Sequence, residues 1–300
     1  MRLLSALFPC ASFPGRSVAL AAMITAALFS ATAFAQNDGN ASSGRATAAQ
    51  SDGKTGTSSA TQGDEAIANP GRPTVSTPAT LTPVGYLQFE SGLMAAWHSP
   101  EFSSQTNISE VMKFSVQRRI ELIAGSGPFV HSNTEPINGT GDVLLGVQGV
   151  AHEGQGARPT IALSYFHDFY SGGTPDLDIG TPKNSVILLA SADVKGFHYD
   201  TNYLFNDVAN DQGVHRAQFG QTLSVSHPLT GKFGLSGEIW HFTQPFLRGH
   251  AIGNLWALNY NARKNLVFDI GFNRGLTDTS TRWEFLVGFT YLLPHKIHLH

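Results

Sequence analysis

The sequence has little cysteine, little charge and no apolar run of the length that a membrane-spanning helix needs. Cys10 is the single cysteine in 300 residues. It lies in a stretch that we expect to be removed as a leader, so the mature chain can form no disulfide. This excludes the small exported domains that disulfides hold together. The longest apolar stretch, Val18–Phe29, falls short of the roughly 20 residues that a spanning helix requires.

Charged residues make up 14% of the chain, against roughly 25% in an average globular protein. The formal net charge is −3. A nucleic-acid-binding protein would need a clustered basic surface, so we expect no nucleic-acid partner.

The N-terminus has the three parts of a secretory signal. Arg2 and Arg16 form a basic region, Val18–Phe29 is the apolar part, and Ala33-Phe34-Ala35 is an A-x-A cleavage site. The pattern predicts a signal peptide over 1–35 and therefore an exported protein.

Residues 36–83 contain mostly Ala, Ser, Thr, Gly, Asp and Gln, with almost no large apolar side chain. Such a composition buries too little surface to offset the loss of chain entropy on folding. We expect a disordered periplasmic arm, stiffened near its end by Pro70, Pro73, Pro78 and Pro83. The alternative is that part of the arm folds back to plug or line a lumen.

The region 265–293 alternates apolar and polar side chains with a period of two. Phe268, Ile270 and Phe272 fall on one side, and Asp269, Gly271 and Asn273 on the other. Strict alternation predicts a strand with two unlike faces. An aromatic face opposite a polar, glycine-rich face is typical of a transmembrane β-hairpin.

The same pattern extends back to residue 84. The predicted strands are 84–98, 107–116, 120–126, 141–152, 160–169, 184–194, 197–206, 216–226, 233–242, 252–261, 266–273 and 282–293. Ile187 and Leu189 interrupt the polar face, and Glu110 and Trp240 fall on the wrong faces, which predicts a bulge. Every proline after residue 84 falls outside these segments, as the missing N–H of proline favours.

Longer and shorter connections alternate along this region, as they do in bacterial outer-membrane barrels. Because a sheet in lipid must pair all its backbone groups, it has to close. The predicted fold is therefore all-β, a closed antiparallel transmembrane barrel of about twelve strands over 84–294, followed by a tail over 295–300. An even strand number would put both termini in the periplasm of a Gram-negative bacterium. The alternative is a soluble β-sandwich, whose core the aromatic residues would fill.

Charged side chains on the polar face cannot face lipid without a large cost, so we expect them to line water or pair inside the barrel. The predicted lumen-lining residues are Glu90, Lys113, Glu121, Asp142, Asp200, Glu238, Asp269 and Glu284. They could form a rigid internal network or a pathway selecting solutes, and the excess of acids predicts preference for cations or neutral solutes. The predicted interfacial aromatic belt comprises Trp256, Tyr260, Trp283 and Tyr291.

Three stretches resemble the putative "meta-pathway of phenol degradation" outer-membrane transporter family. They are the opening strand region 80–92, the Gly-Asp…Gly strand over 141–148, and the closing hairpin from Phe268 to Tyr291. The resemblance covers about 78–294 and implies passage of small organic molecules. The His-rich tail over 295–300 departs from the usual ending at an aromatic last strand.

We therefore expect a passive outer-membrane channel for small organic solutes, hydrophobic or aromatic ones among them, with outer-membrane lipid and lipopolysaccharide as its surroundings. The alternatives are a structural or adhesive barrel without an open pore and, less favoured, an outer-membrane lipid or ester hydrolase. Ser224, Ser226, His227 and His241 could supply a hydrolase pair, although no spacing singles them out. We expect no cofactor. A metal site at His295, His298 and His300 is a minor alternative.

Overall fold

The computed structural model describes residues 66–173 and 180–297. The predicted signal peptide, the first part of the predicted arm (36–65), and His298 and His300 lie outside the described residues. The strands are β1 (Leu87–Trp97), β2 (Ser104–Gln117), β3 (Ile120–Ser132), β4 (Asn138–Gly139), β5 (Val143–His152), β6 (Thr160–Tyr170), β7 (Thr181–Val194), β8 (Phe197–Ala209), β9 (His215–Pro228), β10 (Phe233–Gln244), β11 (Gly249–Arg263), β12 (Leu266–Gly275) and β13 (Trp283–Leu292).

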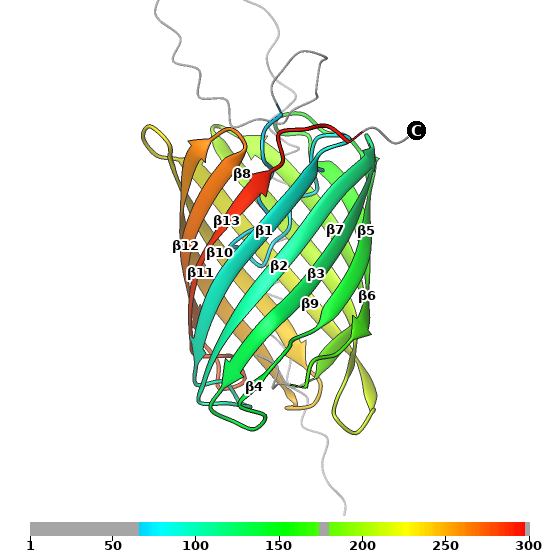
Figure 1. The fold of residues 1–300 in the computed structure, drawn as a ribbon, viewed down its shortest axis with the longest axis vertical. Coiled ribbons are helices and arrows are strands. Elements are labelled where there is room, and N and C mark those ends of the chain that lie inside the picture. The colour runs from blue at the N-terminus through cyan, green and yellow to red at the C-terminus, as the bar shows by residue number, and fades with distance from the viewer. Residues whose placement is uncertain (1–65, 174–179, 298–300) are drawn as a thin grey trace, which may run out of the picture. The chain divides into compact units, whose positions relative to one another are not determined.

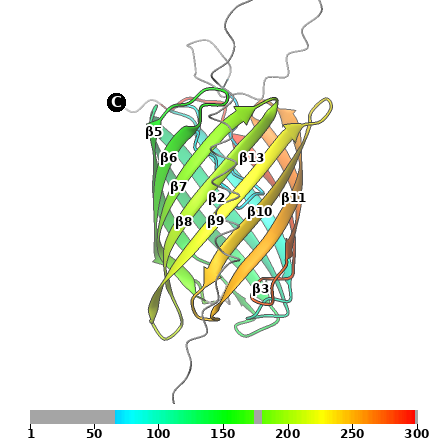
Figure 2. The ribbon, with the colours of Figure 1, turned by 180° about the vertical axis from the view of Figure 1, so that it is seen from behind.

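The strands form one antiparallel sheet that closes on itself. Each long strand pairs with its neighbours in the chain, and β1 also pairs with β13, from Gln88↔Leu292 to Trp97↔Trp283. The two-residue β4 adds only to the edge of β3. The wall is therefore a ring of twelve strands with β4 outside the ring, which Figures 1 and 2 show from opposite sides. The predicted fold class is confirmed.

All twelve predicted segments coincide with ring strands, but the proline rule was too strict. Pro128 lies in β3, Pro182 in β7, and Pro228 ends β9. The β2–β3 register shifts between Ile108 and Glu110, beside Pro128, and the β7–β8 register shifts next to Pro182. Proline is tolerated at such bulges because the missing N–H removes no ladder bond there.

The connections differ at the two ends of the ring. At one end the turns include Arg118-Arg119 and Lys195-Gly196, and the latter has φ of 52° and 85°. Two successive positive φ values are typical of a type I′ turn, whose twist suits adjoining strands. The opposite end carries the longer connections, such as 133–142 and 171–180. The connection 153–159 is an exception, since it is long and lies at the short-turn end.

The two faces of the wall are chemically different, as the alternation predicts. Outward positions carry exposed apolar side chains such as Leu163, Phe205, Ile270 and Phe285, while many inward positions carry buried polar ones. Among residues 66–173 and 180–297, no helix is long and apolar enough to cross a membrane.

Residues 66–83, which we call the inner segment, differ from the favoured prediction and follow the stated alternative, in which part of the arm folds back into the ring. The sequence places them in a disordered arm, but they lie inside the ring and hydrogen bond to its inner face. In Figure 1 the segment is the blue stretch that leads into β1. The entropy argument missed it because its binding depends on polar contacts with the wall rather than on apolar burial within the segment.

Candidate functional site

The inner segment first meets the wall at Ala68, whose N donates to Lys264 O over 2.9 Å and whose side chain packs on Val267 and Leu292. An amide pair follows. Asn69 N donates to Gln88 Oε1 over 2.8 Å, and Gln88 Nε2 donates back to Asn69 O over 2.7 Å. One side chain of β1 thus satisfies both backbone groups of one residue, as a neighbouring strand would do. This matters because a buried backbone group without a partner is costly.

A buried ion pair follows immediately. Lys113 Nζ of β2 lies 2.6 Å from Glu90 Oε1 of β1, and both side chains are almost fully buried. The same carboxylate oxygen accepts a hydrogen bond from Gly71 N over 3.1 Å. Gly71 fits here because a Cβ at this position would come within 2.5 Å of Lys113 Nζ. The cation and the segment therefore share one carboxylate.

Arg72 of the inner segment lies against a surface made by two glycines. Its Nη1 donates to Ser109 Oγ over 3.1 Å, and its Nε lies 3.6 Å from Asp269 Oδ2. Gly92 of β1 and Gly288 of β13 pair with each other, and a Cβ on either would overlap the Arg72 side chain. The wall sequence therefore leaves space for this guanidinium.

Glu238 of β10 forms the most connected anchor. Its carboxylate accepts hydrogen bonds from Val75 N over 2.7 Å, from Ser76 N over 2.6 Å and from Ser76 Oγ over 2.6 Å. Ser76 Oγ also lies 2.7 Å from Thr222 Oγ1 of β9. Hydrogen bonds to an ionised acceptor are about twice as strong as neutral ones, so Glu238 holds the middle of the segment.

Beyond Ser76 the segment is held by neutral groups. Asn202 of β8 pairs with both backbone groups of Thr77, at 2.6 and 2.9 Å. Ala79 N donates to Ser191 Oγ over 2.7 Å, and Gln148 Nε2 donates to Pro78 O over 3.0 Å.

The last part of the segment also meets apolar side chains. Ala79 is fully buried in a cluster with Ile187 and Leu189 of β7, against which Leu81 packs. Ile187 and Leu189 interrupt the polar inner face in sequence, and this contact explains them. Thr82 N then donates to Glu121 Oε2 of β3 over 2.8 Å.

The predicted lumen-lining residues thus divide into two groups. Glu90, Glu121, Glu238 and Asp269 contact the inner segment directly, and Lys113 pairs with Glu90.

The remaining three are placed differently. Asp200 accepts a hydrogen bond from Ser191 Oγ. Asp142 precedes β5 and accepts from Gly172 N over 2.9 Å, and burial raises the pKa of its carboxyl despite that bond. Glu284 lies on β13 opposite Ala96 and Asn273.

The predicted belt residues occupy the outer face. Tyr260 and Tyr291 lie towards the short-turn end, and Trp283 lies at the other end with the Arg274 guanidinium 3.6 Å from its ring. Trp256 differs, since it lies midway along β11 and covers Gly237.

The residues considered for a hydrolase pair do not come together. Ser224 is buried on the inner face of β9, whereas His227, with its ring centre 4.5 Å from that of Phe197, and His241, which stacks on His250, lie at outward positions. The described residues contain no group of three or more His, Cys, Asp or Glu that could hold a metal ion.

The inner face carries one further pattern that the sequence analysis missed. Leu144, Phe166, Trp240 and Phe242 each lie over an inward glycine of a neighbouring strand, at Gly125, Gly146, Gly253 and Gly220 respectively. Trp240 also donates from Nε1 to Asn273 Oδ1 over 2.8 Å. Its odd position therefore reflects an inward indole and not a bulge, because the β10 registers are continuous.

Known proteins are similar in fold and not in sequence. No model of a protein family matches the chain, and no curated protein matches it. An outer-membrane channel of the COG4313 group from Pseudomonas putida F1 aligns with a TM-score of 0.52 at 12% identity, covering 72% of this chain and 98% of that one. The NanC porin aligns with a TM-score of 0.48 at 13% identity, over 69% and 100% of the two chains, and the KdgM porin with 0.46 at 12%, over 72% and 99%. The chain has the fold of outer-membrane barrel channels.

Proposed function

We propose that the protein is an outer-membrane channel for small solutes whose lumen is closed by the inner segment and opens when that segment shifts. The observation that carries the proposal is the closed ring with residues 66–83 bonded across its interior, from Gln88 on β1 to Glu238 on β10. A ring with unlike faces suits a bilayer, because it leaves no unpaired strand edge in lipid. On this proposal outer-membrane lipid and lipopolysaccharide surround the barrel, and the short turns and both termini face the periplasm.

The inner face supports small organic solutes as the cargo, in line with the resemblance to the phenol-degradation transporter family. Ligand sites are mostly apolar with a few polar groups that fix orientation. The inward side chains over glycines provide such surface beside amides and carboxylates. A hydrophobic or aromatic solute of modest size fits this combination better than a highly charged one.

Charge selectivity follows from the same geometry. If the segment moves, it uncovers Glu90, Glu238 and Asp269, while Lys113 remains paired with Glu90 on the wall. The opened pore would then favour cations or neutral solutes. A reversal potential in a salt gradient that shows anion selectivity would contradict this part of the proposal.

A structural or adhesive barrel is the second candidate, and the density of contacts to the inner segment favours it. On that alternative the segment never leaves. The channel and the structural barrel differ in what happens when the wall contacts that hold the inner segment are removed.

The test is single-channel conductance in planar bilayers. The double variant Arg72→Ala with Glu238→Ala removes the ion pair to Asp269 and the three hydrogen bonds to Glu238. We expect larger or more frequent openings than in the unmodified protein. The matched control, Arg118→Ala with Glu153→Ala, removes an exposed pair and should leave conductance unchanged. A folded double variant, verified by heat-modifiable gel mobility, that conducts like the unmodified protein would favour the structural barrel.

A further inference from the structure

Strands β9 and β10 separate before they end. Their pairing runs from Gly234↔Pro228 to Phe242↔Gly220, yet β9 begins at His215 and β10 continues to Gln244. Just past the last pair, Phe219 N donates to the Thr243 hydroxyl over 2.9 Å and not to a backbone carbonyl. The wall is therefore open between two strands that are each paired on their other side.

A cleft of about 530 Å³ occupies this gap. At the loop end it is bridged by Arg216, whose Nη1 donates to Pro245 O over 2.7 Å and whose guanidinium lies 5.0 Å from the centre of the Phe246 ring. The Phe219–Thr243 bond limits its other end. A volume of this size is typical of sites for small molecules and does not suit a lipid with several acyl chains.

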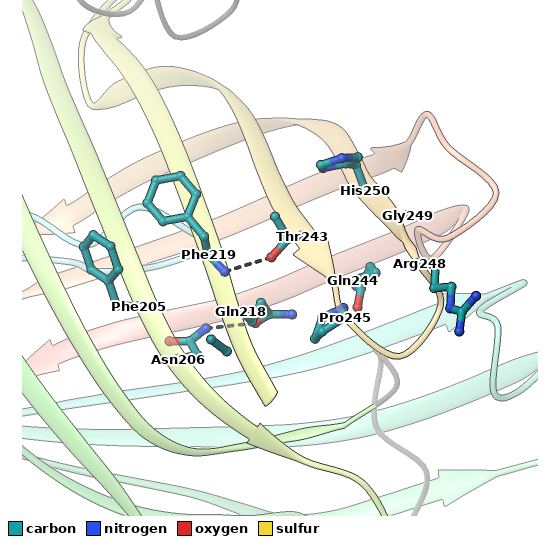
Figure 3. Close-up of a pocket in the computed structure, with 11 residues that line it drawn as sticks. Phe205, Asn206, Gln218, Phe219, Thr243, Gln244, Pro245, Arg248, Gly249 and His250 are labelled. Atoms are coloured by element: carbon teal, nitrogen blue, oxygen red, sulfur yellow. Dashed lines mark hydrogen bonds between the residues drawn. The ribbon is translucent and has the colours of Figure 1, made fainter. Parts of the chain in front are cut away.

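The lining of the cleft has an apolar part and a part made of amides, and Arg248 and His250 also line it where β10 turns into β11. Phe205 and Phe219 lie with ring centres 5.3 Å apart and face outward, and Ala217 and Pro245 extend this apolar part. The amides of Asn206, Gln218 and Gln244 face inward and are at least nine-tenths buried. Figure 3 shows the two rings together and the amides lower in the view.

Two of these amides have unused hydrogen-bonding atoms. Asn206 Nδ2 donates to Gln218 Oε1 over 2.9 Å. Asn206 Oδ1 and both polar atoms of Gln244 have no partner among the described residues, and Gln244 is only 1% exposed. A buried polar group without a partner costs about 1–3 kcal/mol, so these atoms identify what a ligand has to supply.

The unpartnered donor and acceptor atoms of Gln244 and Asn206 determine which head group a ligand must have. Gln244 Nε2 needs an acceptor, while Gln244 Oε1 and Asn206 Oδ1 need donors. A carboxylate only accepts and an ammonium only donates, whereas a hydroxyl group does both. We propose that this cleft binds a single-chain amphiphile whose head carries hydroxyl groups, with its apolar body against Phe205 and Phe219 and its head on Gln244 and Asn206. This site is separate from the inner segment and goes beyond the channel proposal.

The test compares three probes of equal chain length on the purified full-length mature protein in amine-oxide micelles. Hexyl β-glucoside, hexanoate and hexylamine are titrated by isothermal calorimetry. We expect saturable binding of the glucoside at one site, with the other two probes bound about tenfold more weakly, as the loss of one or two hydrogen bonds implies.

Substitutions then locate the site. Gln244→Leu should weaken glucoside binding about tenfold and narrow the difference in affinity between the three probes, and Gln244→Glu, which keeps the size but loses the donor, should weaken glucoside binding in the same direction. Gln212→Leu in the connection 210–214 changes an exposed amide of the same kind outside the cleft and should bind like the unmodified protein. Equal binding of all three probes, or unchanged glucoside binding in folded Gln244 variants, would overturn the proposal. Neither result depends on whether the lumen conducts.

Discussion

Beyond Ala68, the two halves of the inner segment are held by different kinds of interaction. Residues 69–77, the proximal half, meet Glu90, Glu238 and Asp269 and the ion-paired Lys113. Residues 78–83, the distal half, meet the apolar cluster around Leu189, neutral donors and acceptors, and one carboxylate. The proximal half therefore depends on a few strong contacts, each removable by one substitution, whereas the distal half depends on many weaker ones.

The largest expected effect comes from breaking the buried ion pair of the proximal half. Lys113→Met leaves the Glu90 carboxylate buried beside Gly71 N with no cation. Removal of one partner of a buried pair costs about 3–5 kcal/mol, which we expect as a lower free energy of unfolding in urea. Arg119→Met, at an exposed pair with Glu153, should stay within about 0.5 kcal/mol of the unmodified protein. Equal unfolding free energies of the two variants would show that the buried pair does not hold the proximal half more strongly than an exposed pair would.

A cavity in the distal half should have the next largest effect. Leu189 is fully buried in the cluster with Ala79, and Leu→Ala substitutions in such sites cost about 2–5 kcal/mol. We expect Leu189→Ala to lower the unfolding free energy in this range, with the same loss at low and high salt. The control is Leu163→Ala, which makes the same change of side chain at an outward position of β6 and not in the buried cluster. A loss confined to low salt would mean that the distal half is not held by apolar contacts.

The smallest of the three effects is local. Glu238→Gln weakens the hydrogen bonds to Val75 N and Ser76 N, and bonds to charged groups contribute about 1.5–3 kcal/mol. We expect a cysteine introduced as Ser76→Cys, at a fully buried position, to react with a maleimide at least about tenfold faster in the Glu238→Gln background than alone. Glu110→Gln changes a carboxylate on the outer face of β2 and should not alter this rate. Unchanged labelling would show that Glu238 does not hold the segment.

The ring was predictable because the side chains of each strand alternate between an apolar face and a polar face, and this alternation is visible within the strand itself. The alternation around Phe268 and Asp269 needs no knowledge of distant residues, since an apolar and a polar environment on the two faces of a strand select opposite side chains at successive positions. The bulge near Glu110 was also visible as a residue on the wrong face, and the β2–β3 register shifts there. The Trp240 position showed the same signal for a different reason, because an indole replaces a polar side chain over Gly253.

The inner segment was not predictable in the same way. Its residues have no periodicity, and its partners lie far away in sequence, such as Ser76 with Glu238 and Thr77 with Asn202. One signal was present. An inner face with Glu90, Glu121, Glu238 and Asp269 but few cations needs donors from elsewhere. A chain of small residues that prolines keep extended has backbone N–H groups free to supply them.

The most direct test of the central claim is a reversible lock on the inner segment. The Ser76 and Thr222 hydroxyl oxygens lie 2.7 Å apart, and the mature chain that we predict contains no cysteine, so Ser76→Cys with Thr222→Cys can form one disulfide without competition. The account predicts that the oxidised double variant conducts less than either single variant in planar bilayers, and that a reductant restores the openings. If the oxidised and reduced forms conduct equally while the disulfide is verified by mass spectrometry, residues 66–83 do not close the lumen.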